Sequence, residues 1–159
     1  MSCDGEDAGV PMRPERISGA AGGDRIIANA VSTRMSKQRR RDTAPELQLR
    51  KSLFARGLRY RVDAPLPGMP RRRADVLFTR RRVAVFVDGC FWHSCPLHGT
   101  LPRSNHDWWV AKLMKNVARD RETDAHLLNI GWVVLRYWEH EDMGSAAEVV
   151  ERTVRTGSP

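Results

Sequence analysis

The sequence is poor in the residues on which several classes of protein depend. Only three of its 159 residues are cysteine, an odd number that argues against a disulfide framework and for a reducing compartment. No stretch approaches the ~18 uninterrupted apolar residues that a membrane-spanning helix needs. The N-terminus also lacks the apolar centre of a signal peptide. We therefore expect neither a disulfide-rich secreted protein nor a membrane protein.

Acidic residues are outnumbered by basic ones, 19 against 27, and the excess lies beyond the first part of the chain. Residues 1–30 carry a net charge of −2 and the rest of the chain +10. A basic domain of this size points to phosphate backbones or anionic membranes, although a solvated basic surface explains the charge equally well. Residues 1–30 show no sustained period, so we expect a poorly ordered leader followed by one domain at residues 31–156.

Hydrophobic periodicity predicts a mixed α/β domain. Thr43 and Glu46 have the spacing of a capping box, and they begin a helix that should stop at Gly57. Residues 65–70 have the proline and glycine content of a turn. The other predicted elements are strands at residues 60–62, 74–79, 83–87 and 132–138, and helices at residues 107–130 and 145–155.

The segment Val83–Val87 is apolar on both faces, which is typical of a strand in the middle of a sheet. The strand at residues 74–79 should pair with it as an antiparallel hairpin, because only a short basic turn joins them. The segment continues directly into Asp88, Gly89 and a loop with two cysteines. The end of such a strand is where open sheets usually place their chemistry.

A metal site is predicted in this loop, where Cys90, Cys95 and His98 lie within nine positions. Thiolate and imidazole ligands together favour zinc, and a structural zinc site requires a fourth ligand. His93 lies inside the loop, but His140 follows the strand at 132–138, which should lie beside the central one. We therefore favour His140. Two cysteines that bind no metal are the alternative.

Carboxylates on neighbouring strands suggest a second metal. Asp75 lies on the hairpin partner of the strand that ends at Asp88, and two such carboxylates can hold a hard cation such as Mg²⁺. With His93 beside them, the arrangement suits phosphodiester cleavage, since a metal neutralises the phosphate while an imidazole handles a proton of the attacking water. Each acidic candidate also has a purely structural explanation. A lone aspartate on a strand, such as Asp75, is often a pairing residue. Glu46 is explained by the capping box, and Asp120 can pair with arginines on its helix.

Two pairs of adjacent aromatic residues stand out, Phe91-Trp92 in the loop and Trp108-Trp109 at the start of the long helix. Such side chains are commonly part of a core. In a basic domain they can also act as apolar wedges that kink duplex DNA, and stacking of an aromatic ring on a base contributes about 1–3 kcal/mol.

The chain closely resembles the very short patch repair (Vsr) DNA mismatch endonucleases in five segments. These are RDTAPE, LPGMPRRRADVLF, VAVFVDGCFWHSCPLHG, WW-x5-KN-x2-RD and GW-x5-WEH, spread from about Val31 to about Arg155. The resemblance implies a restriction-endonuclease-like α/β fold, with a mixed central sheet flanked by helices and a structural zinc. It also implies an enzyme that uses Mg²⁺ to nick one strand of DNA 5′ to the thymine of a T·G mismatch. Such mismatches arise when 5-methylcytosine deaminates, which links the chain functionally to a cytosine-5 DNA methyltransferase.

The resemblance also assigns roles to individual residues. Asp75 resembles the metal-binding aspartate, Val87 would offer its backbone carbonyl to the same Mg²⁺, and His93 resembles the catalytic histidine. Residues that resemble the groups holding water molecules around the metal are Glu46, Asp88 and Asp120. The zinc ligands of the family match Cys90, Cys95, His98 and His140, and the intercalating wedge matches Phe91, Trp92 and Trp109. Asp88 departs from the pattern, because the best-known member has a histidine there.

We therefore expect a zinc-stabilised, Mg²⁺-dependent, strand-specific nickase of mismatched double-stranded DNA. We expect it to act as a monomer in the bacterial cytoplasm, in association with the nucleoid. Two alternatives remain open. One is a restriction-like endonuclease of the same fold with a different target, such as double-strand cleavage at a fixed site. The other is a non-enzymatic zinc-containing module that binds distorted DNA.

Overall fold

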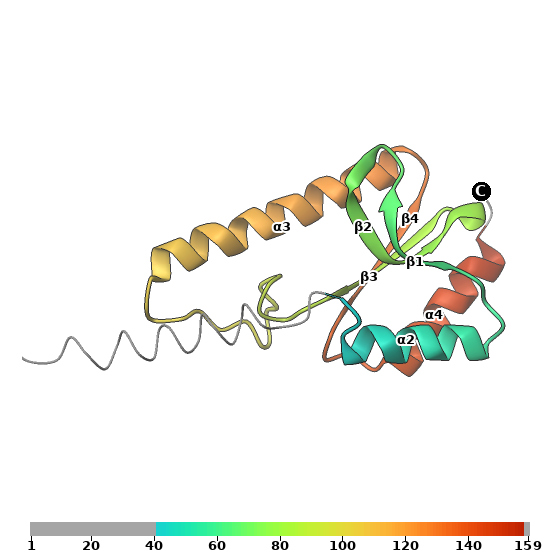
Figure 1. Ribbon diagram of the computed structural model, residues 1–159, viewed down its shortest axis with the longest axis horizontal. Coiled ribbons are helices and arrows are strands. Elements are labelled where there is room, and N and C mark those ends of the chain that lie inside the picture. The colour runs from blue at the N-terminus through green and yellow to red at the C-terminus, as the bar shows by residue number, and fades with distance from the viewer. Residues whose placement is uncertain (1–40, 158–159) are drawn as a thin grey trace, which may run out of the picture. The chain divides into compact units, whose positions relative to one another are not determined.

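A four-stranded mixed sheet, in the order β1-β2-β3-β4, forms the centre of the computed structural model (Figure 1). The structure describes residues 41–157; the predicted leader at residues 1–30 and the first ten residues of the predicted domain lie outside this range. The elements in chain order are α2 (Ala44–Ala55), β1 (Arg61–Leu66), β2 (Met69–Phe78), the 3-10 turn η1 (Thr79–Arg81), β3 (Val83–Asp88), α3 (His106–Asn129), β4 (Val133–Trp138) and α4 (Met143–Thr156).

The central strand β3 has one antiparallel and one parallel neighbour. On one side Val85 lies opposite Val76 of the antiparallel strand β2, so the predicted hairpin is confirmed. On the other side Val85 lies opposite Leu135 of the parallel strand β4, and the pairing continues to Asp88 and Trp138. Because β3 and β4 run in the same direction, the segments that follow them leave the sheet at the same edge.

Helices cover both faces of this sheet. On one face α2 and α4 lie side by side (Figure 1). The apolar cluster beneath them is formed by residues of both helices and of the sheet, among them Leu49, Leu53, Val76, Val85 and Val150. On the other face, near the end of α3, Leu127 is fully buried in a second cluster with Ala84 and Phe86. Burial on both faces explains why β3 is an uninterrupted apolar segment.

The region at residues 60–70 differs from the prediction. The strand expected at 60–62 extends to Leu66, and β2 already begins at Met69, so the proline-rich segment contains a turn of only Pro67 and Gly68. Pro65 is tolerated because β1 is an edge strand, where a missing N–H donor leaves no neighbour unpaired. The pairing register of β1 with β2 shifts beside Pro65.

The capping box predicted at the start of α2 is wrong in detail. The side chain of Thr43 makes no capping bond to the first turn. Instead its hydroxyl donates a hydrogen bond of 2.9 Å to Glu46, whose carboxylate also accepts the backbone N–H of Asp42 at 2.9 Å. Glu46 is buried, and it holds the segment before the helix rather than the first helical turn. The predicted stop is confirmed, since α2 ends just before Gly57, which has a φ of 77°.

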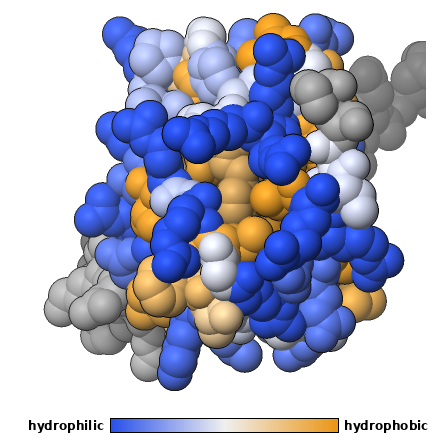
Figure 2. Space-filling model, turned by 90° about the vertical axis from the view of Figure 1, so that its right-hand side faces the viewer, coloured by the Kyte–Doolittle hydropathy of each residue, from blue (hydrophilic) through white to orange (hydrophobic). Residues whose placement is uncertain are grey.

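The surface is rich in arginine. Figure 2 shows one face of the molecule, on which hydrophilic side chains surround smaller apolar areas. Within residues 41–157, the exposed arginines of the sheet and its turns that make no ion pair are Arg61, Arg71, Arg80, Arg81 and Arg82. None of the described helices is long and apolar enough to cross a membrane.

Two glycines allow the turn before β2 to be tested against a matched control. Gly57 and Gly68 have φ values of 77° and 74°, but a Cβ at Gly57 would meet no atom within 4 Å, whereas a Cβ at Gly68 would lie 2.7 Å from Nε2 of His126. Gly57→Ala should reduce the free energy of unfolding by about 1–2 kcal/mol, the cost of a left-handed conformation. Gly68→Ala should reduce it by about 1 kcal/mol more, because His126 must give up its hydrogen bond to the carbonyl of Pro67.

Urea unfolding of the two variants measures the difference. Equal midpoints for Gly57→Ala and Gly68→Ala would show that His126 accommodates the added methyl group without loss.

Candidate active site and metal centre

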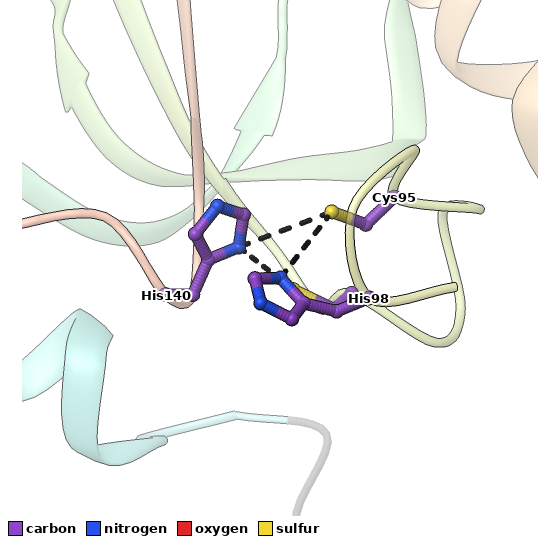
Figure 3. Close-up of side chains that lie close together, drawn as sticks. Cys95, His98 and His140 are labelled. Atoms are coloured by element: carbon purple, nitrogen blue, oxygen red, sulfur yellow. Dashed lines mark hydrogen bonds between the residues drawn. The ribbon is translucent and has the colours of Figure 1, made fainter. Parts of the chain in front are cut away.

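Two cysteines and two histidines meet at the edge of the sheet where β3 and β4 end. Cys90, Cys95 and His98 lie in the loop after β3, and His140 lies two residues after β4. Figure 3 shows the side chains of Cys95, His98 and His140 turned toward one another. Nδ1 of His140 lies 3.0 Å from Sγ of Cys90 and 3.9 Å from Sγ of Cys95, which is also 3.9 Å from Nδ1 of His98.

This Cys/His cluster has the donors and the spacing of a four-ligand metal site. One ligand atom from each residue lies within 4.8 Å of the others, and no other group in the described part of the chain meets this test. Burial raises the pKa of the Cys90 thiol to about 11, and the neighbouring Cys95 and Glu139 add to the effect. A raised pKa keeps the thiol protonated, so the thiolate that binds a metal is favoured only when a cation lies nearby. Two sulfurs and two imidazole nitrogens suit zinc.

His93 lies in the same loop but takes no part in the cluster. Its Nδ1 is 2.6 Å from Oδ2 of Asp120 on α3 and 3.6 Å from Oδ1 of Asp88. A carboxylate can only accept, so Nδ1 carries the hydrogen and, in the neutral ring, Nε2 is left as an acceptor. Burial lowers the pKa of His93, but the hydrogen bond to Asp120 and the charges of Asp88 and Asp120 outweigh it and raise the pKa above its usual value.

Asp75 lies within β2, a strand with a neighbour on each side, and not at the end of that strand. One of its oxygens accepts the backbone N–H of Val87 at 2.7 Å, and the other accepts no hydrogen bond within residues 41–157. Burial raises the pKa of Asp75 to about 7; the hydrogen bond from Val87 opposes this effect, and the charges of Glu46 and Asp88 add to it. A buried carboxylate among like charges is stabilised by a bound cation. Asp75 therefore fits a Mg²⁺ ligand, and Mg²⁺ needs only one or two carboxylates when waters complete its shell.

Asp88, the last residue of β3, is buried and held by an arginine of the neighbouring strand. Nη1 of Arg136 donates to both of its carboxylate oxygens at 2.8 Å. Burial raises the pKa of Asp88 above its ordinary value, although Arg136 and His93 oppose the change. The charge of Asp88 in turn raises the pKa of both Asp75 and His93.

The aromatic residues gather beside His93. The ring centroids of Phe91 and Trp109 are 5.3 Å apart, and those of Trp92 and Trp109 are 6.0 Å apart. Trp109 is buried, whereas Phe91 and Trp92 are partly exposed and Trp108 is 56 % exposed. Nζ of Lys112 lies 4.6–5.6 Å from the ring centroids of Trp92, Trp108 and Trp109, so its ammonium group makes cation–π contacts with these three rings.

Comparison with known proteins assigns the chain to a family. Residues 24–97 match the family model described as DNA mismatch endonuclease Vsr. The type II nicking enzyme V.NaeI of Lentzea aerocolonigenes is 47% identical over 125 residues, which cover 77% of this chain and 75% of that enzyme. The chain belongs to the Vsr family. It is therefore a DNA endonuclease.

Two further Vsr-family relatives differ in how much of them the chain spans. The type II nicking enzyme V.NmeDIP of Neisseria meningitidis serogroup C is 35% identical over 83% of this chain and 90% of that enzyme. The DNA mismatch endonuclease Vsr of Escherichia coli K12 is 42% identical, over 62% of each chain. The match to the E. coli enzyme thus covers less than two thirds of its length.

The structure joins the predicted site residues of this Vsr-family enzyme in separate groups: His93 with Asp120 and Asp88, and Asp75 with the backbone of Val87. Asp120 lies against His93 instead of standing on a solvated helical face with arginines alone. Three residues escaped the sequence analysis. Arg136 is the one charged residue in the strand VVLRYW, Lys112 follows the tryptophan pair by one helical turn, and Glu139 accepts the N–H of Cys90 at 2.8 Å. A lone charge in an apolar strand is the signal that could have drawn attention to Arg136.

The metal centre can be tested by ligand replacement. Cys95→Ser should purify with less than one equivalent of metal and with a lower Tm, because a structural site contributes free energy of folding. His93→Gln is the matched control from the same loop, and it should retain the metal, since His93 contacts Asp120 and not the cluster. Elemental analysis and thermal unfolding measure both effects. Full metal content in Cys95→Ser, or an unchanged Tm after strong chelation, would contradict the site.

Proposed function

We propose that this Vsr-family endonuclease nicks one strand of duplex DNA 5′ to the thymine of a T·G mismatch, with Mg²⁺ at Asp75 and zinc at the Cys/His cluster. The observation that carries the proposal is the hydrogen bond between His93 and Asp120. It fixes an imidazole in a loop that also carries Phe91 and Trp92, directly after the strand whose Val87 N–H donates to Asp75. The E. coli relative is a DNA mismatch endonuclease, which supports the proposed substrate, and the relatives that are nicking enzymes support cleavage of one strand.

His93 is the proposed general base. Asp120 accepts the hydrogen of Nδ1 and fixes the ring, so Nε2 is free to take a proton from the water that attacks the phosphorus. The new bond joins the water oxygen to phosphorus, and the bond from phosphorus to the leaving sugar oxygen breaks. When bound, Mg²⁺ supplies positive charge to the phosphate and to the leaving oxygen.

Asp75 and the backbone carbonyl of Val87 are the proposed Mg²⁺ ligands. Asp75 is positioned for this role by the N–H of Val87, which holds one carboxylate oxygen and leaves the other for the ion. Glu46 and Asp88 raise the local negative charge around Asp75, and we assign them to the water molecules around the ion. Asp120 combines this task with orientation of His93.

The aromatic cluster is the proposed wedge that detects the mismatch. Phe91 and Trp92 are partly exposed, and the buried ring of Trp109 supports both. A mismatched pair stacks less firmly than a matched one, so its opening costs less free energy, and inserted rings regain stacking. The unpaired arginines of the sheet provide positive charge for the phosphate backbone. Because T·G pairs arise by deamination of 5-methylcytosine, we propose that the enzyme is functionally linked to a cytosine-5 DNA methyltransferase.

Cleavage of defined duplexes tests the function. A strand-labelled duplex with one T·G pair should be cut once, 5′ to the thymine, in the presence of Mg²⁺, and T·A and C·G duplexes of the same sequence should remain intact. His93→Ala and Asp75→Ala should each lower the single-turnover rate by about 10²–10⁴. Asp63→Asn is a matched control, because Asp63 lies on β1 and, among residues 41–157, forms ion pairs only with Arg41 and Arg73.

Each alternative function predicts a different product. Linear plasmid from perfectly paired DNA would favour a restriction-like endonuclease. Unchanged cleavage of T·G duplexes by Asp75→Ala would contradict the proposed mechanism. Mismatch binding with no cleavage under any divalent ion would favour a binding module. Varying the bases that flank the mismatch in the same assay identifies the preferred site.

Replacement of Trp92 tests the wedge. Trp92→Ala should weaken binding to a T·G duplex roughly tenfold to 100-fold, the equivalent of one lost stacking contact, and should weaken binding to matched DNA much less. Phe54→Ala removes an exposed aromatic ring on α2 and should leave both affinities unchanged. Fluorescence anisotropy at constant salt measures the affinities. Equal losses on matched and mismatched duplexes would rule out the wedge.

A further inference from the structure

Arg136 is a charged residue in the middle of β4, and it contacts three carboxylates. Nη1 donates to both oxygens of Asp88 at 2.8 Å, and Nε donates to both oxygens of Asp124 at 3.0 Å. Nη2 lies 3.7 Å from Oδ1 of Asp120. The guanidinium also stacks over the ring of Phe86, with a distance of 4.4 Å to the centroid. Each nitrogen of one rigid group is thus directed toward a different acid.

Two of these three acids face the same atom of His93. Nδ1 is 2.6 Å from Oδ2 of Asp120 and 3.6 Å from Oδ1 of Asp88. The ring has a single hydrogen at this position, so the two carboxylates are competing acceptors. A rotation of the ring toward Asp88 would lengthen the bond to Asp120 and turn Nε2 away from its direction.

We propose that Arg136 is a positioning residue that occupies both oxygens of Asp88 and so leaves the Nδ1 hydrogen of His93 to Asp120. The proposal rests on the proposed role of His93 as general base. Among residues 41–157, Arg136 makes no hydrogen bond or ion pair with the imidazole or with Asp75, although its charge also acts on His93 at longer range. It acts through the acids, and Asp124, one helical turn after Asp120, anchors it on the same face of α3.

The geometry requires arginine. A guanidinium is planar and presents its donors in a fixed fork, so it can serve Asp88 and Asp124 in two directions at once. A lysine in its place has one nitrogen at the end of a flexible stem and cannot hold two carboxylates in fixed positions. Arg136→Lys keeps the charge and loses the fork, which separates charge neutralisation from orientation.

A purely structural role is the competing explanation, because Arg136 also ties β4 to β3 and α3. Arg72 provides a matched control. It has the same side-chain exposure of 21%, and it ties β2 to α3 through the carbonyl of Arg119 and the carboxylate of Glu122, both at 2.6 Å. It contacts no acid that faces His93. Arg72→Gln should lower stability without changing the rate of the chemical step.

Single-turnover cleavage of a T·G duplex by the full chain gives the first readout. Arg136→Gln should lower the rate constant at saturating enzyme by about tenfold to 100-fold, part of the contribution of a positioned general base, with little change in DNA affinity. Arg136→Lys should recover part of the loss. If Arg136→Gln and Arg72→Gln lose rate only in proportion to their loss of Tm, the positioning role is wrong.

Histidine side-chain NMR gives a second readout that does not depend on activity. At one alkaline pH, protein with ¹⁵N-labelled histidine should show His93 with a hydrogen on Nδ1, and His93→Gln identifies the signal. Arg136→Gln should shift or broaden this signal, whereas Arg72→Gln should leave it in place. An unchanged His93 signal in Arg136→Gln would overturn the inference. Full activity of His93→Ala would instead overturn the proposed function, and the NMR comparison would still decide whether Arg136 orients the ring.

Discussion

The parallel pairing of β3 with β4 is the constraint on which the rest of the site depends. Two parallel neighbours end at the same edge of a sheet, so the loop after β3 meets the segment after β4. This pairing brings His140 to two cysteines that lie about fifty residues earlier, and Arg136 to Asp88. A register shift of one residue would turn the side chains of β4 to the opposite face and remove Arg136 from Asp88. Because β3 is apolar on both faces, the contact of Arg136 with Asp88 distinguishes this alignment more sharply than apolar burial does.

Charge is the second constraint, since the sheet and α3 place several acids close together. Asp88 and Asp120 face His93, Asp75 lies within the electrostatic reach of Asp88, and burial strengthens the repulsion between these acids. One arginine offsets Asp88, and His93 offsets Asp120. Within residues 41–157 no arginine or histidine pairs with Asp75, and the charge of Arg50 only partly opposes the rise of its pKa to about 7. The acid with the least compensation is thus the one that a divalent cation would bind most favourably.

Sequence patterns predicted the sheet better than they predicted the site. Val83–Val87 had to be central because it is apolar on both faces, and Gly57 and Gly131 mark helix ends with φ values of 77° and 75°. Local spacing also led to the Cys/His cluster. The hairpin at Pro67-Gly68 was missed because prolines tolerated in an edge strand look like a longer turn. The role of Arg136 could not be predicted, since its three acidic contacts lie 12 to 48 residues away and depend on tertiary packing.

The two sites of the enzyme are joined through one short loop. His93 lies between the cluster residues Cys90 and Cys95, its N–H donates to the carbonyl of Gly89, and the N–H of Cys95 donates to the carbonyl of Cys90. This loop has no regular secondary structure, and the packing of Phe91 and Trp92 on Trp109 holds only its middle part. A metal ion that binds both cysteines would fix the ends of the segment that carries His93, Phe91 and Trp92. A metal at the cluster would then contribute to catalysis by restricting the motion of the proposed base and the proposed wedge, without contact with the substrate.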